Sequence, residues 1–83
     1  MMNFVEIRNL VVEVLDNKLH GATLKDRTLQ SKTSIDFDRY EWTLKFDKKN
    51  YKINVDHNKE LKEVEIWVWN DFDLIVRYTK QYI

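Results

Sequence analysis

The first part of the chain has the hydrophobic spacing of an amphipathic helix. Between residues 3 and 19, apolar side chains recur every three or four positions, and acidic and amide side chains collect on the opposite side of a helical wheel. Asn3 followed by Glu6 resembles an N-terminal capping box, and Gly21 suits the end of a helix. We therefore expect one helix, whose apolar arc is wider than a single sheet contact requires.

From Arg39 onward the hydrophobic pattern has a period of two, which indicates β-strands. The alternating runs begin at Tyr40, Tyr51, Val64 and Leu74. Polar clusters at residues 47–50 and 57–60, and again from Asn70, interrupt these runs and are typical of turns. The pattern predicts an antiparallel β-meander of three or four strands.

The connection between the helix and the meander has the weakest pattern. Over residues 22–37, a few apolar residues are scattered among Thr, Ser and charged residues. We expect an irregular segment there, with one short strand or one helical turn as the only regular structure. The whole chain, residues 1–83, is then a single α+β domain with an N-terminal helix packed on an antiparallel three- to four-stranded β-meander.

The segment from Val64 to Trp69 departs from the pattern of a sheet with one solvated face. In a strand its three aliphatic residues share one face, so that Glu65, Trp67 and Trp69 share the other. That second face should carry polar side chains if it meets only water. Either residues 22–37 or the spare arc of the helix cover the two tryptophans, or the tryptophans form an interaction surface.

Matching the apolar faces of neighbouring strands predicts the register of each hairpin, because a one-residue slip would turn every side chain to the wrong face. The predicted opposite pairs are Phe46 with Tyr51, Val55 with Val64, and Val68 with Leu74. This register places Lys45, Lys52, Trp67 and Ile75 in one row of the outer face. It also sets Glu65 opposite Arg77 and leaves Trp69 at the rim of the row.

The predicted register gathers three carboxylates, those of Glu41, Asp56 and Glu63, at the far end of the outer face. Carboxylates suit a hard cation, but the chain has no loop with the alternating ligand spacing of a calcium site. A solvated face is the simpler interpretation, and we expect no metal.

Composition excludes several kinds of chemistry. The 83 residues include no cysteine, no proline and one glycine. Disulfides, thiolate zinc sites and cysteine nucleophiles are therefore absent, and glycine-rich phosphate loops cannot be built. The histidines are His20 and His57, and Asp56 should point to the opposite face from His57. We expect no catalytic residues, no enzyme activity and no cofactor.

Charge and hydropathy limit the partners. Fourteen basic and fourteen acidic residues cancel, so the chain has no net field to attract nucleic acid or an anionic membrane. No apolar run approaches the roughly 20 residues of a membrane span, and the N-terminus lacks the basic start of a signal peptide. We expect a cytoplasmic protein that does not associate with membranes.

These observations favour a small, non-enzymatic protein-binding protein. The expected partner-binding residues are Trp67, Trp69, Ile75, Lys45, Lys52, Glu65 and Arg77. Small α+β chains of this kind are common among toxin-neutralising, immunity and phage-encoded inhibitor proteins, an analogy of fold class alone. An inhibitor would act by occluding an enzyme. The alternatives are a nucleic-acid-binding accessory protein that uses the tryptophan–lysine row and an obligate homodimer with a structural role.

Overall fold

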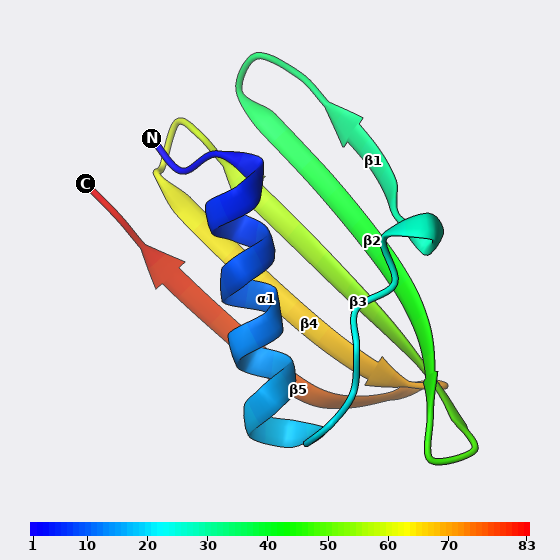
Figure 1. Cartoon of the computed structure of the whole chain (residues 1–83). Helices are drawn as coiled ribbons and strands as arrows, with labels where there is room; N and C mark the ends of the chain where they lie inside the picture. The colour runs from blue at the N-terminus through cyan, green and yellow to red at the C-terminus, as the bar shows by residue number, and fades with distance from the viewer.

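Helix α1 packs across one face of a single antiparallel sheet (Figure 1). A computed structural model describes all of residues 1–83. The elements are α1 (Phe4–Lys18), the 3₁₀ turn η1 (Asp26–Thr28), β1 (Gln30–Thr33), β2 (Phe37–Phe46), β3 (Lys49–Asn58), β4 (Glu63–Asn70) and β5 (Asp73–Gln81). The strands lie in the order β1-β2-β3-β4-β5. The predicted α+β class is confirmed, with five strands in place of three or four.

The sequence signals at both ends of α1 are confirmed. The Asn3 side chain accepts a hydrogen bond from the backbone N–H of Glu6 at 2.9 Å, and the Glu6 carboxylate accepts one from the backbone N–H of Asn3 at 3.1 Å. This reciprocal capping box satisfies two N–H groups that have no partner within the helix. Beyond the last turn, Gly21 adopts a φ of +86°, a conformation that glycine reaches without steric cost.

The core lies between α1 and the inner face of the sheet. Sixteen buried apolar residues form one cluster, to which α1 contributes one side and β2, β3 and β4 the other. Trp42 of β2 is its largest fully buried side chain, and the Phe4 ring of α1 lies 6.2 Å from it between ring centroids. Burial of large aromatic and aliphatic side chains is the main favourable term in folding. The apolar cluster between α1 and the sheet therefore holds the two layers together.

The first hairpin is tighter than the sequence pattern predicts. Only Asp47 and Lys48 join β2 to β3, so that Phe46 lies opposite Lys49 and the predicted pairing of Phe46 with Tyr51 is wrong. Asp47 and Lys48 have φ values of 51° and 63°, as expected for a two-residue type I′ turn. Because this turn follows the natural twist of the strands, the ladder extends further than a four-residue turn would allow.

The other two hairpins are also shifted by two residues from the predicted register. The observed pairs are Val55 with Ile66 and Val68 with Val76, in place of Val64 and Leu74 as the partners. A shift of two residues changes the neighbours of a side chain but keeps it on the same face of the sheet. The predicted inner and outer faces are therefore kept for β2, β3 and β4, whereas the rows of the outer face change. The bulge in β5 reverses the prediction for Leu74, which lies opposite Trp69, and for Ile75, which packs against the core.

The connection over residues 22–37 holds both regular elements that its pattern left open, η1 and β1. The Thr28 hydroxyl lies 2.8 Å from the carbonyl oxygen of Thr43 and accepts a hydrogen bond from the Thr43 N–H at 3.1 Å. These contacts hold η1 against β2, and β1 then extends the sheet beyond β2 as a short edge strand. No helix in the chain is long and apolar enough to cross a membrane.

The type I′ turn predicts the effect of glycine at two adjacent positions. Lys48→Gly should raise the free energy of unfolding by about 0.5–1 kcal/mol, because glycine adopts a positive φ without strain. Lys49→Gly, the matched control, should lower it by a similar amount of about 0.5–1 kcal/mol, because Lys49 lies in a strand. Urea unfolding of both variants measures the difference, and equal effects would contradict the observed turn.

Candidate binding surface

The outer face of the sheet, opposite α1, is uncovered. Residues 22–37 stay at the β2 edge, where β1 pairs with β2, while β4 lies three strands away from β1. Figure 1 shows α1 over one face and no element over the other. Trp67 and Trp69, which point outward from β4, are consequently both partly exposed. Neither the connection nor the helix covers them.

The structure keeps two of the three predicted apolar anchors, Trp67 and Trp69, on the outer face, whereas the third, Ile75, packs against the buried core. Trp67 and Trp69 follow each other on the outer face of β4, and the ladder between β4 and β5 shifts register between Val68 and Trp69. Ile75 is the extra residue of this bulge, and Leu74, directly opposite Trp69, is exposed. We call Trp67 and Trp69 the tryptophan patch. Ile75 therefore does not belong to the predicted outer row, and Leu74 takes the position beside Trp69.

The two predicted lysines do not share a row. Lys52 lies opposite Trp69 on the neighbouring strand, whereas the predicted register sets it beside Trp67. Lys45 lies opposite Asn50, one row closer to the first hairpin, and not opposite Lys52. The first correction follows from the register of β3 with β4, and the second from the two-residue turn, which moves β3 along β2. Lys52 and Trp69 are consequently opposite each other in one row of the outer face.

Glu65 and Arg77 interact, although they are not directly opposite as the sequence predicts. Arg77 lies opposite Trp67, and Thr79 lies opposite Glu65. The Arg77 guanidinium reaches diagonally and donates through Nε to Glu65 Oε2 at 2.7 Å. Such an exposed pair contributes about 0–1 kcal/mol to stability. Its main effect is to hold the Arg77 side chain beside Trp67 at the polar rim of the patch.

The predicted cluster of three carboxylates does not form, because the corrected register separates its members. Glu41, Asp56 and Glu63 lie in three different rows. Asp56 instead forms an ion pair with Arg39 at 3.4 Å. Partial burial raises the pKa of Asp56 above its usual value, and Arg39 opposes this rise. No three His, Cys, Asp or Glu side chains gather closely enough to hold a metal ion.

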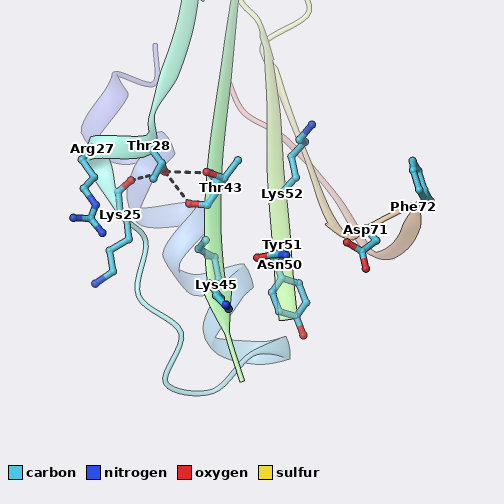
Figure 2. Close-up of a pocket in the computed structure, with 11 residues that line it drawn as sticks. Lys25, Arg27, Thr28, Thr43, Lys45, Asn50, Tyr51, Lys52, Asp71 and Phe72 are labelled. Atoms are coloured by element: carbon cyan, nitrogen blue, oxygen red, sulfur yellow. Dashed lines mark hydrogen bonds between the residues drawn. The ribbon is translucent and has the colours of Figure 1, made fainter. Parts of the chain in front are cut away.

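A hollow of about 650 Å³ lies on the outer face, near the first hairpin and the β4–β5 turn (Figure 2). Its charged lining residues are Lys25, Arg27, Lys45, Lys52 and Asp71. We call this hollow the basic groove. Lys45 and Lys52 are predicted site residues, but the sequence did not indicate Lys25 or Arg27, because their segment has no regular pattern. The Thr28–Thr43 hydrogen bonds in Figure 2 bring that segment to the groove.

A polar cluster is buried on the inner face, and it too was missed by sequence reasoning. His57 is 1% exposed, with its Nε2 atom 2.5 Å from the Tyr82 hydroxyl and its Nδ1 atom 3.5 Å from Asp38 Oδ2. Lys59 Nζ lies 3.0 Å from Asp38 Oδ1. Asp56, the sequence neighbour of His57, lies on the other face as expected. The carboxylate beside the imidazole is therefore that of Asp38.

The environment of His57 disfavours its charged form. Burial lowers the pKa of His57 because desolvation destabilises the imidazolium, while the Asp38 carboxylate partly opposes this shift. A Tyr–His–Asp chain can move protons where substrate reaches it. Here neither His57 nor Asp38 lines any of the four main hollows. The cluster instead ties Tyr82, near the C-terminal end, to the strands.

The outer face thus combines the tryptophan patch with the basic groove, and the opposite pair of Lys52 and Trp69 connects them. An apolar, aromatic surface beside a group of cations is suited to binding a macromolecule. In comparisons with known proteins, no family model, no curated protein and no solved structure matches the chain.

The buried imidazole predicts that stability falls on acidification. Unfolding restores the ordinary His57 pKa of about 6.5, so below that pH the unfolded state binds more protons and the free energy of unfolding decreases. The decrease should continue until the pH reaches the lower pKa of the folded state. Urea unfolding between about pH 7.5 and 5 measures it. His57→Gln should flatten this dependence, whereas the exposed control His20→Gln should keep it; equal slopes in all three proteins would contradict the assignment.

Proposed function

We propose that this chain is a non-enzymatic protein-binding protein that occludes a surface of its partner through the outer face of its sheet. The observation that carries the proposal is the tryptophan patch on a sheet face that nothing in the chain covers. Exposed apolar patches mark interfaces, and tryptophan is enriched among the residues that contribute most to binding. Where the partner is an enzyme, occlusion would inhibit it, as in immunity and phage-type inhibitors.

The position of the patch in the sheet supports this role. Strand β4 is paired on both sides, with β3 and β5, so its backbone is held before any partner arrives. The backbone of such a strand loses little freedom on binding, which increases the free energy left for affinity. Around the tryptophans, Lys52 and the Glu65–Arg77 pair supply the polar rim that surrounds the centre of many interfaces.

The chemistry of the chain supports binding in preference to catalysis. His57 is buried against Asp38 and Tyr82, and the outer face carries no histidine. The absence of cysteine fits a reducing compartment, and we place the protein in the cytoplasm on that ground.

The central test removes the two anchors. Trp67→Ala/Trp69→Ala should weaken binding to the partner recovered from the native host by at least about 30-fold, since a single hot-spot residue contributes about 2 kcal/mol or more. Ile35→Ala/Leu61→Ala is the matched control, because it truncates two exposed apolar side chains outside the patch. Titration calorimetry with the purified partner measures both. Equal affinities would contradict the proposal.

Fluorescence of the free protein checks the premise of that test. Acrylamide should quench the wild type strongly, and Trp67→Phe/Trp69→Phe weakly, because only the fully buried Trp42 then remains. If the double variant and the wild type are quenched alike, the two tryptophans are not accessible and cannot anchor a partner.

Self-association is a second candidate, favoured by a different part of the molecule. Strand β5 is a nine-residue edge strand, and its Leu74 and Tyr78 side chains are exposed. A hollow of about 170 Å³ lies between α1 and β5, lined in part by Leu10, Val14 and Val76. Free strand edges pair with other chains, and an antiparallel pair of β5 strands would join two sheets.

Sedimentation velocity distinguishes this candidate. If β5 mediates a homodimer, the wild type should sediment as a dimer at micromolar concentration, and Tyr78→Lys should sediment as a monomer because the charge disrupts an apolar contact. Thr33→Lys on the other edge strand, β1, is the control. A monomeric wild type would exclude the homodimer and leave the binding of a different protein unaffected.

A further inference from the structure

We infer that the basic groove binds an acidic segment of the partner protein, whose carboxylates pair with Lys25, Arg27 and Lys45. The inference rests on the proposed function and specifies the chemistry of the partner next to the tryptophan patch. It assigns a role to cations that neither the core nor the sheet requires.

Three of the four cations that line the groove have no ion-pair partner. The ion pairs of the outer face are Arg39 with Asp56, Arg77 with Glu65, and Lys52 with Glu41. Lys25, Arg27 and Lys45 form no ion pair at all. Lys52, the fourth cation of the groove, is 3.7 Å from Glu41 and remains half-exposed. Three unpaired cations and Lys52 thus line one hollow, whose single acidic lining residue is Asp71.

These cations come from separate segments that the fold brings together. Lys25 and Arg27 flank Asp26 at η1, Lys45 is on β2, and Lys52 is on β3. In Figure 2 they surround the hollow, with Lys25 and Arg27 on the side of the β2 edge. Like charges that line one hollow repel each other, and walls of low dielectric concentrate their field in the hollow. An anionic ligand in the groove would relieve that repulsion, which provides a driving force for binding.

The limits of the groove favour a short protein segment over a nucleic-acid strand. Asp71 lines the groove at the β4–β5 turn, and Glu41 stands next to Lys52 on the other side. A phosphate backbone needs a basic path that continues past the hollow, and the chain has no net positive charge to supply one. A few carboxylates on a folded partner need only the hollow itself.

The residues around the groove also indicate which other side chains the acidic segment of the partner carries. Lys52 lies directly opposite Trp69, so a partner seated on the tryptophan patch extends over the groove without a gap. Phe72, which is 97% exposed, stands at the far rim from Lys25 (Figure 2). A partner segment that crosses the groove from Lys25 therefore contacts cations first and the Phe72 ring last. The matching sequence has several Asp or Glu residues next to an apolar side chain.

The test uses a fluorescein-labelled peptide of about ten residues, in which Asp and Glu alternate with Leu, and follows its anisotropy. The wild type should bind it, and the affinity should fall as salt rises from about 50 to 300 mM. Lys25→Glu/Lys45→Glu should weaken binding about tenfold. Lys32→Glu/Lys62→Glu changes the net charge equally at exposed lysines outside the groove, and it should alter binding by less than about twofold.

Several results would overturn the inference. Absence of peptide binding would do so, and so would an equal loss in the two charge-reversed variants, since the effect would then be one of net charge. An oligothymidylate of about 12 nucleotides that binds the groove more tightly than the peptide would assign it to single-stranded nucleic acid.

The proposed function can be contradicted or supported independently of the inference about the groove. If Lys25→Glu/Lys45→Glu leaves the affinity for the purified partner unchanged while Trp67→Ala/Trp69→Ala abolishes it, the groove is not part of the interface but the patch is. If the tryptophan variant binds the partner normally, the proposed function itself is wrong, whatever the peptide does.

Discussion

The packing of α1 against the inner face of the sheet is the contact on which the rest of the molecule depends. A chain of 83 residues buries only about 60% of the surface that it exposes when unfolded, so it forms one core between the helix and the sheet and no further layer on the outer face. Here that core contains Trp42 and fifteen other buried apolar residues between the helix and the inner face. The outer face therefore contributes little to the core, and its residues are free to serve another purpose. The tryptophan patch lies on that face.

The sequence predicted the type of most elements and the sheet face of most strand residues. It did not predict which residues lie opposite each other on adjacent strands. Alternation with a period of two assigns strand residues to faces whatever the register, which is why the outward position of Trp67 and Trp69 could be predicted. It fails across the bulge, where Leu74 lies opposite Trp69 and Ile75 packs against the core. Register depends on turn length, and the type I′ turn at Asp47 and Lys48 lacks the glycine that usually marks it. That turn alone moved Lys52 away from Lys45.

The remaining features depend on contacts that no pattern reports. The basic groove exists because hydrogen bonds between Thr28 and Thr43 bring η1 to the β2 edge, and residues around Thr28 carry no periodic signal. The His57–Asp38 contact depends on the same corrected register, which sets these two residues opposite each other. In both cases the sequence indicated some of the residues of the feature, but the residues that lie next to them could be identified only from the structure.

The two chain ends have a consequence for how the surface is presented. Both termini lie at the same end of the molecule, and the first hairpin, which borders the basic groove, lies at the other (Figure 1). The hydrogen bond between Tyr82 and His57 holds the C-terminal segment to the strands, while Ile83 beyond it is fully exposed. A chain tethered through either terminus, to a bead, a surface or a fused domain, would therefore stand with the groove facing away from its anchor.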